Sequence, residues 1–275
     1  MLAEYIHAPI SRKGMDLRYN CDTVFHTFDF HAHEDYEIFY FQKGEVQYYL
    51  EEKAYNLVSG DVLLIPPSVM HRAVMVDENA LFQRYVLMLS DERCCKLLEG
   101  VDGIFTCRQA KPMRINFQGE DRADFCRKLE QMMRLPNDSA GYLAGDSLCT
   151  LLLLQLEQYA REHKDHGEEL IQQAQEYVRY INAHFTEAIT LEDVAKRFFI
   201  SKTHLMRRFK KYTNTTVHNY ITTKRILLAK ALLKEGISPT EVATACGFAS
   251  YTSFYQAFVR HEGVRPSQHI RGNQK

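Results

Sequence analysis

The N-terminal part of the chain alternates short apolar runs with polar turns. From about Val24 to Leu89, the runs are rich in aromatic and β-branched residues, and Gly, Pro, Ser and Asp interrupt them at intervals of roughly 8–12 residues. Such runs favour strands, because branched and aromatic side chains pack well on a pleated sheet. The pattern predicts a small antiparallel barrel or sandwich. Its runs include "VFHTFDFHAHEDYEIFYF", "VQYYLEEKAYNLV" and "FQRYVLML".

The spacing of apolar positions then becomes helical. Two helices are predicted, in "EDRADFCRKLEQMMRL" and "SAGYLAGDSLCTLLLLQLEQYAREH", with the "PND" of residues 136–138 as their connection. The second helix has more apolar positions than one buried face needs, so it either packs on both sides within the chain or is buried against a partner. We predict a homodimer through residues 143–162, with Gln155 fixing the register, and a linker at 163–169. The surplus positions are Leu148, Leu151, Leu152, Leu154 and Leu156.

The C-terminal part contains one unit twice. "ITLEDVAKRFFISKTHLMRRF" at 189–209 aligns with "ISPTEVATACGFASYTSFYQAF" at 237–258. Each copy predicts a helix, a turn of three or four residues and a second helix that begins at a capping serine, Ser201 or Ser250. A long helix at about 217–234 joins the copies. This geometry presents a second helix to the major groove of DNA.

Charge is divided unevenly between the two halves. Residues 169–275 hold 16 Lys and Arg against 8 Asp and Glu, whereas residues 1–168 hold 18 against 27. A basic half that also carries two helix-turn-helix units indicates double-stranded DNA as the partner.

The second helix of each unit carries polar side chains on its outer face. Arg207 and Gln256 are the strongest candidates for reading base edges, because Arg and Gln pair bidentately with guanine and adenine. We predict base contacts also from Thr203, Met206, Tyr251, Thr252 and Tyr255, and phosphate contacts or a solvated basic face from Lys202, Arg208, Lys210 and Lys211.

Residues 170–272, above all the ending "GFASYTSFYQAFVRHEGVRPSQHIR", resemble the DNA-binding domain of the AraC/XylS transcription regulators. One departure is Phe198-Phe199, where the family usually has Leu-Gly. The resemblance implies a multi-domain α and β fold, with an N-terminal cupin-like antiparallel β-barrel and two following helices, then an all-α domain of two tandem helix-turn-helix units. We expect an effector-binding barrel at 1–110, a helical dimerisation segment at 111–165 and the DNA-binding domain at 166–275. RNA polymerase is a candidate partner.

The stretch "HAHEDYE" holds the candidate chemistry of the barrel. His31, His33 and Glu37 share odd parity, so on an extended strand they project from one face, and His71 follows "PPSVM". Their spacing resembles the two cupin motifs. Three imidazoles and a carboxylate suit Zn, Fe, Mn or Ni.

Three interpretations of this cluster remain. The four side chains are purely structural, or they bind a polar effector directly or through a metal, or they form a catalytic metal site. We favour a sensor without enzymatic activity, in a one-component transcription regulator whose effector the family resemblance suggests is a sugar, with carbohydrate-utilisation genes as targets. The alternatives are a metal-dependent cupin enzyme with an accessory DNA-binding domain, and an effector-independent regulator with a vestigial barrel.

Cysteine usage and the N-terminus predict the compartment. The seven cysteines include an adjacent pair and no C-x-x-C, which is neither a disulfide framework nor a zinc module. The sequence "MLAEYIHAPISRKG" lacks a basic region followed by an apolar core. We therefore expect a soluble cytoplasmic protein without a membrane partner.

Overall fold

The structure is a computed structural model, and it describes residues 10–12, 14–22, 29–76, 81–103, 105, 110–162 and 173–272. The predicted linker at 163–169 lies outside these residues. No helix in the described ranges is both long and apolar enough to cross a membrane.

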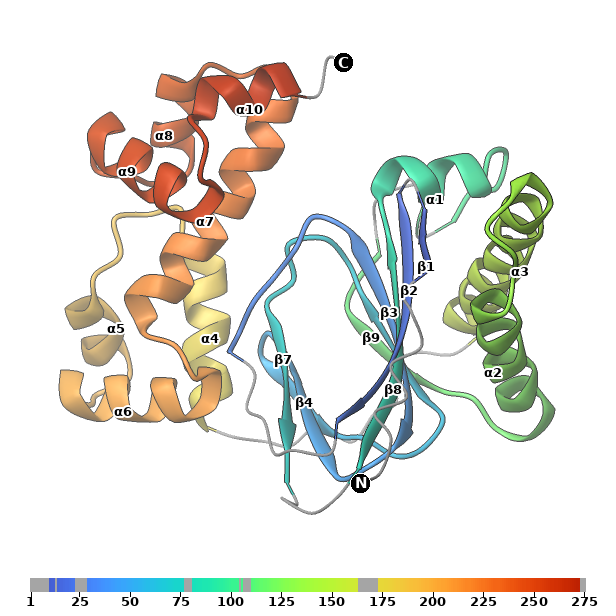
Figure 1. Ribbon diagram of the computed structural model, residues 1–275. Helices are drawn as coiled ribbons and strands as arrows, with labels where there is room; N and C mark the ends of the chain where they lie inside the picture. Colours follow the sequence, from blue (N-terminus) through green and yellow to red (C-terminus); the bar gives the residue numbers. More distant parts are fainter. Residues whose placement is uncertain are drawn as a thin grey trace.

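Two antiparallel sheets form the N-terminal domain, as the alternating runs predict (Figure 1). The larger sheet has the strand order β1-β2-β8-β3-β6-β9, and the smaller has the order β5-β4-β7. The strands are β1 (Ile10–Arg12), β2 (Met15–Asp22), β3 (Tyr36–Lys43), β4 (Val46–Leu50), β5 (Lys53–Asn56), β6 (Asp61–Ile65), β7 (His71–Met75), β8 (Phe82–Leu89) and β9 (Met113–Asn116).

Strand β3 is buried on both of its faces. Phe39 and Phe41 point between the two sheets, where they join a core with Tyr48 of the smaller sheet. Ile38 and Tyr40 point the other way, into a second core that the helices complete. This explains why "IFYF" at residues 38–41 is an unbroken apolar run and does not alternate with polar residues.

Helices α1 (Asp91–Leu97), α2 (Gly119–Met133) and α3 (Ser139–Glu162) complete the N-terminal domain. Leu152, Leu153 and Leu156 of α3 are buried in the core of the larger sheet. Leu143 and Leu151, in contrast, are 70% and 52% exposed. Helix α3 therefore packs on one side within the chain, and apolar side chains on its other side remain exposed to solvent.

In its described residues, 173–272, the C-terminal domain consists of helices, and the second helix of each unit begins at the predicted capping serine. The Ser201 and Ser250 side chains accept hydrogen bonds from the first turns of α6 and α9, and the joining helix α7 spans the predicted residues. The helices are α4 (Gln173–His184), α5 (Leu191–Arg197), α6 (Lys202–Thr213), α7 (Val217–Lys234), α8 (Pro239–Ala245), α9 (Tyr251–Glu262) and α10 (Pro266–Gly272).

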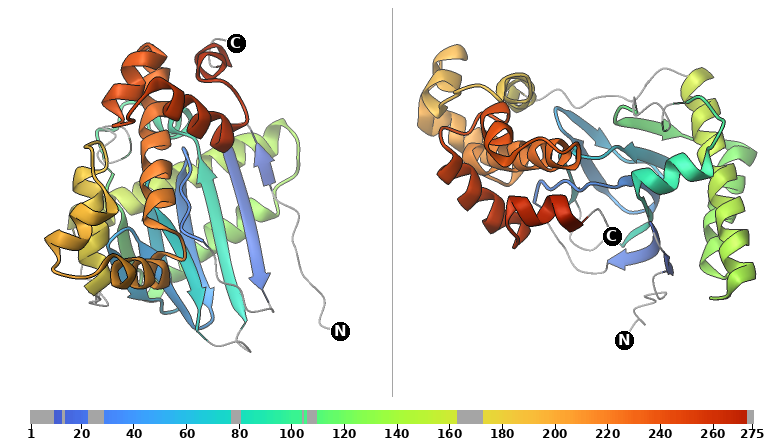
Figure 2. Two further views of the ribbon diagram at one scale, coloured as in Figure 1. Left: turned by 90° about the vertical axis from the view of Figure 1, so that its left-hand side faces the viewer. Right: turned by 90° about the horizontal axis from the view of Figure 1, so that it is seen from above.

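The two domains share a packed interface. Phe30 and Tyr49 of the barrel belong to the same buried cluster as Tyr212 and Tyr220 of the first helix-turn-helix unit. The C-terminal domain and the helices α2 and α3 cover opposite sides of the barrel, which Figure 1 and the right-hand view of Figure 2 show. The smaller sheet thus lies next to the DNA-binding domain, and the larger sheet lies next to α2 and α3.

Candidate effector site and DNA-reading surface

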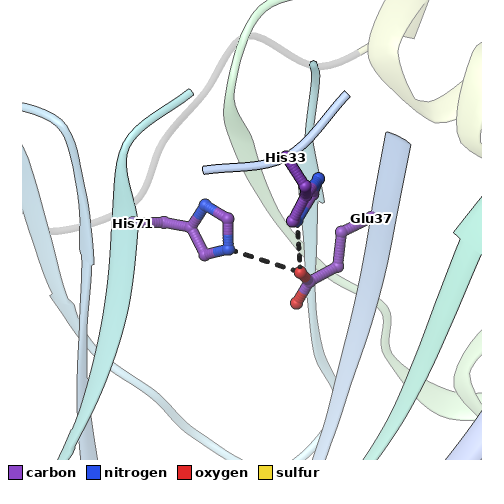
Figure 3. A group of neighbouring side chains, drawn as sticks. All are labelled: His33, Glu37 and His71. Atoms are coloured by element: carbon purple, nitrogen blue, oxygen red, sulfur yellow. Dashed lines mark hydrogen bonds and ion pairs between the residues drawn. The ribbon is translucent and has the colours of Figure 1, made fainter. Parts of the chain in front are cut away.

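His33, Glu37 and His71 meet at one end of the barrel (Figure 3). Glu37 lies on β3, His71 begins β7, and His33 lies in the segment before β3. Two backbone hydrogen bonds join His31 to His71, at 3.1 and 2.9 Å, and the Ser68 amide donates to the His33 carbonyl at 2.8 Å. These bonds hold the segment of residues 29–34 against the end of the smaller sheet.

Both imidazoles approach the same carboxylate oxygen. His33 Nε2 is 2.9 Å from Glu37 Oε2, and His71 Nε2 is 3.3 Å from it. The second contact has an ion-pair distance without hydrogen-bond geometry, so the fully buried His71 Nε2 has no hydrogen-bond partner among the described residues. The nitrogen is held by this ion-pair contact alone, and a further group with better geometry would complete the site.

Backbone carbonyls fix which nitrogen of each ring carries a proton. The Nδ1 atoms of His33 and His71 lie 2.8 Å from the carbonyl oxygens of Asp35 and Val69. A carbonyl only accepts, so each Nδ1 donates, and the Nε2 atoms face an ionised carboxylate that also only accepts. The contact therefore requires positive charge between them, either as protons on Nε2 or as a bound cation.

The electrostatics of the site favour an ionised carboxylate. Burial alone would raise the pKa of Glu37, but its interactions with His33 and His71 hold the pKa well below its usual range. Burial would lower the pKa of His33, and the hydrogen bond and charge of Glu37 outweigh this effect and raise it. Glu37 is therefore ionised, and its charge is balanced either by protonated imidazole or by a bound cation.

The donor atoms fit a metal ion. One ligand atom from each of His33, Glu37 and His71 lies within 4.8 Å of the other two. Two imidazoles and a carboxylate, with each Nδ1 bound to a carbonyl, are the donor set and the outer hydrogen bonds that zinc and similar ions use. These three residues would hold the ion, and it would supply the missing positive charge.

His31 lies beside this group rather than in it. Its ring centroid is 4.3 Å from that of His71, and its Nδ1 bonds to the Asp29 carbonyl at 2.9 Å. Burial and the nearby His71 lower the pKa of His31. Tyr48, which the sequence analysis did not select, stacks on His71 with ring centroids 6.3 Å apart and ring planes 8° apart.

The predicted reading positions of both units lie on the surface. On α6, Leu205 and Phe209 are buried while Thr203, Met206 and Arg207 are exposed. On α9, Phe254 and Phe258 are buried, and Tyr251, Thr252 and Gln256 are exposed, with Tyr255 half-buried. Among the predicted phosphate contacts, Lys202, Arg208, Lys210 and Lys211 are all exposed.

Two adjoining hollows lie between α6 and α9. Their volumes are about 390 and 410 Å³, and Ile189, His218 and Ile221 line both. Gln256 borders the first hollow, and Met206 and Lys210 border the second. The outer faces of α6 and α9 are thus joined by a concave surface over the start of α7.

Comparison with known families agrees with both halves of this architecture. A family profile described as an AraC-like ligand binding domain matches residues 13–156, and one described as a helix-turn-helix domain matches residues 194–272. The chain belongs to the AraC family of transcriptional regulators. Its DNA-binding part is the pair of helix-turn-helix units, and its ligand-binding part is the barrel domain.

Proteins named as transcriptional regulators also align over most of the chain. The HTH-type transcriptional activator RhaS of Escherichia fergusonii is 27% identical over 252 residues, which cover 88% of this chain and 87% of RhaS. The uncharacterized HTH-type transcriptional regulator YbfI of Bacillus subtilis is 26% identical over 84% of this chain and 82% of its own. A crystal structure of ToxT from Vibrio cholerae aligns over 95% of this chain and 98% of its own, at 15% identity and a TM-score of 0.44.

This AraC-family chain also carries contacts that the sequence analysis did not foresee. Arg72 donates from Nη2 to the Lys211 carbonyl at 3.2 Å, and Glu34 forms ion pairs with Lys230 and Lys234. All of these link the barrel to the DNA-binding domain. In the sequence, Glu34 and Arg72 have the pattern of ordinary surface charges, and their proximity to His33 and His71 is the only signal that could have selected them.

Proposed function

We propose that this AraC-family regulator reads a specific double-stranded DNA site with α6 and α9, and that a polar effector or cation at His33, Glu37 and His71 controls it. The observation that supports DNA reading is the exposed polar face on each second helix, held by a buried pair of anchors beneath it. Carbohydrate-utilisation genes are the proposed targets, because the melibiose operon regulatory protein of Escherichia coli, 27% identical over 54% of this chain, acts on such an operon.

Two variants on α6 test the reading of DNA. Arg207→Ala should weaken binding to the protein's own upstream region by about 1–3 kcal/mol and relax the preference at one position. Lys210→Ala should weaken binding to all DNA sequences alike. It should also reduce the slope of the logarithm of the binding constant against the logarithm of the salt concentration by about one unit. Anisotropy titrations at two salt concentrations measure both. If Arg207→Ala lowers specific and non-specific affinity by the same factor, Arg207 contacts phosphate rather than a base.

The second part of the proposal is a homodimer through α3. Leu143, Leu151 and Leu154 form one exposed apolar stripe on this helix, and a second copy would cover it. Gln155 is engaged elsewhere, because it accepts from Lys128 at 2.9 Å and donates to the Asp121 carbonyl at 3.2 Å within its own chain. The stripe itself would therefore set the register of the helix pair.

Sedimentation of the full chain tests the dimer. Leu151→Asp should convert a dimer at micromolar concentration into a monomer, because it places a charge in the centre of the apolar stripe. Gln131→Asp, an exposed position on the neighbouring helix α2, is the matched control and should remain dimeric. A wild-type monomer at this concentration would contradict the proposal.

A metal-dependent enzyme is the second candidate function, favoured by the two imidazoles and one carboxylate that the cluster offers. His71 and Glu37 are both buried, which leaves little room for a substrate to reach a metal between them. We therefore prefer sensing. Turnover of a substrate panel by protein loaded with Zn, Fe, Mn or Ni would overturn that preference.

A further inference from the structure

The first of the two hollows lies between α7 and α9, and we call it the α7–α9 hollow. His218 and Arg225 of α7 line one wall, and Gln256, Arg260 and His261 of α9 line the other. None of the described residues that line it is acidic. The hollow therefore presents two guanidinium groups and two imidazoles to an occupant, and this charge favours an anion.

The helices around the hollow are also poor in negative charge. Helices α6, α7 and α9 contain a single acidic residue, Glu262. Its carboxylate is already paired, because Lys230 Nζ lies 2.6 Å from it. No carboxylate of these three helices is thus left to neutralise a cation at the α7–α9 hollow.

One of the two arginines at the hollow is committed to the protein itself. Arg225 donates from Nε to the Phe185 carbonyl at 2.6 Å and from Nη2 to the Glu187 carbonyl at 2.7 Å. Its guanidinium also lies 5.6 Å from the centre of the Phe248 ring. Arg225 therefore helps to build the wall of the hollow.

Arg260 and His218, in contrast, are available to an occupant. Both residues are exposed, and neither side chain forms a hydrogen bond or an ion pair with the described residues. Lys202 of the first unit differs in this respect, since it pairs with Glu192 at 2.8 Å. An arginine without a partner in its own chain keeps its five N–H donors for a ligand.

The position of the hollow indicates which anion it meets. When α6 and α9 occupy successive major grooves, the same side of the duplex shows between them the minor groove and the two strands that border it. The hollow lies between these helices, over the start of α7. In the proposed arrangement it therefore meets the DNA backbone, whereas Gln256, about one helical turn before Arg260, meets base edges.

The internal repeat supports the assignment of Arg260. The second helices of the two units align with an offset of 49 residues, which places Phe209 on Phe258. At the same offset Arg260 corresponds to Lys211, a predicted phosphate contact of the first unit. Helix α6 has further basic residues, but Arg260 is the only lysine or arginine of α9. The second reading helix thus has one strong cation to place against the backbone.

We propose that the α7–α9 hollow binds a phosphate of the DNA backbone between the two reading helices, with Arg260 as its charged ligand and His218 as a donor from the opposite wall. This inference rests on the proposed reading of DNA by α6 and α9, and it adds the site that holds the backbone between them. The planar guanidinium suits this ligand, because a phosphate accepts from two of its N–H groups at once.

Arg260→Gln in the full chain tests the charge. The substitution removes the cation and keeps a long polar side chain at an exposed position. The loss of one phosphate contact should reduce the slope of the logarithm of the binding constant against the logarithm of the salt concentration by about 0.9, on specific and non-specific duplexes alike. Affinity should fall roughly five- to ten-fold at about 0.1 M salt. Anisotropy titrations over a series of salt concentrations measure both quantities.

Arg179→Gln is the matched control. Arg179 is an exposed arginine of α4 in the same domain, and it lines neither hollow. This variant removes the same charge but should change affinity by less than about two-fold, because a charge without a phosphate contact releases no counterion. If both variants lower the salt slope equally, or if neither lowers it, the proposal is wrong.

Neutral methylphosphonates, placed at one phosphate of the duplex at a time, locate the contact. The wild type should lose affinity at a phosphate midway between the base positions that Arg207→Ala and Gln256→Ala affect, roughly five base pairs from each. Arg260→Gln should show no further loss at that phosphate. His218→Ala should weaken binding roughly two- to ten-fold, the contribution of one hydrogen bond, and by less when that phosphate is neutral.

Two results of this scan overturn the proposal. One is an Arg260→Gln variant that remains as sensitive as the wild type at every phosphate. The other is a phosphate that is coupled to Arg260 but lies outside the interval between the two base positions.

These measurements are distinguishable from a failure of base reading, because the salt slope on a non-specific duplex does not depend on base contacts. If Arg207→Ala leaves base preference unchanged while Arg260→Gln still lowers the slope, the base assignment is wrong and the phosphate site is retained. If Arg207→Ala relaxes one position and Arg260→Gln does not change the slope, the phosphate site is wrong and base reading is retained.

Discussion

The turns of the two helix-turn-helix units begin with the same backbone conformation but reach it with different residues. In the first unit, the amides of Phe199 and Ile200 donate to the carbonyls of Lys196 and Ala195 at 3.1 and 3.0 Å. In the second, Gly247 and Phe248 make the corresponding bonds at 3.0 and 3.0 Å. Phe199 and Gly247 both adopt the left-handed conformation, with φ of 54° and 79°. The hydrogen bonds and caps set the turn, and glycine is not required for it.

What differs is the space around the left-handed residue. A Cβ on Gly247 would lie 2.2 Å from the Thr186 carbonyl oxygen, because the chain before α5 packs against this turn. The Phe199 side chain is 94% exposed and meets no such neighbour. The departure from the Leu-Gly pattern therefore leaves the first turn intact, at the cost of backbone strain alone. Glycine in the second unit is a packing requirement.

The largest expected effect comes from placing a side chain at Gly247, where there is no space for one. Gly247→Ala should lower the free energy of unfolding by about 2–4 kcal/mol, since it adds left-handed strain of about 1–2 kcal/mol and an overpacking term of comparable size. Urea titration of the full chain, followed by the exposure of tyrosines, measures the loss.

Gly236→Ala separates the two terms of that prediction. Gly236 also has a positive φ, of 84°, but a Cβ there would meet nothing within 4 Å. Its substitution should cost only the strain, about 1 kcal/mol. Equal losses in the two variants would mean that the contact with Thr186 contributes nothing.

The second prediction compares what the two units read. Gln256→Ala and Arg207→Ala should each cost about 1–3 kcal/mol of binding free energy on the specific site, because each would remove a proposed bidentate base contact. Helix α7 has 18 residues and thus spans about 27 Å, comparable to the ~34 Å between successive major-groove faces. The two variants should therefore relax base preference at positions about one helical turn apart.

Titration of a set of singly substituted DNA sites locates those positions. Thr240→Ala on α8 is the control, because it is an exposed residue of the second unit outside the reading helix. If Arg207→Ala and Gln256→Ala relax the same position, one protomer does not insert both helices side by side.

Local sequence signals predict much of this architecture. Capping residues such as Thr190 and Ser238 predict where α5 and α8 begin, since their side chains bond within four residues. His33 and Glu37 do meet, but not through the parity of one extended strand, because residues 34–35 form a bend and β3 begins only at Tyr36. The caps are predictable because their determining interactions are short in sequence.

Local sequence signals do not predict the contacts between the two domains. Arg72 binds a carbonyl 139 residues away, and Glu34 pairs with a lysine 200 residues away. Nothing in the local pattern distinguishes these two residues from solvated charges. Their partners are determined by how two separately predictable domains pack, which depends on the whole of both surfaces.

The smallest expected effect sharpens the comparison of the two turns. Phe199→Gly should raise the free energy of unfolding by about 0.5–1 kcal/mol. It relieves left-handed strain of about 1–2 kcal/mol, and the greater freedom of glycine in the unfolded chain offsets roughly half of that gain. Little packing is lost, because the side chain is almost entirely exposed. Phe199→Ala is the matched control, since it removes the ring but keeps the Cβ and the strain, and it should change stability by less than about 0.5 kcal/mol. Urea midpoints of the two variants decide between the causes. A gain in both would assign the effect to the exposed ring, whereas a gain in glycine alone assigns it to the backbone and makes the first turn as relaxed as the second.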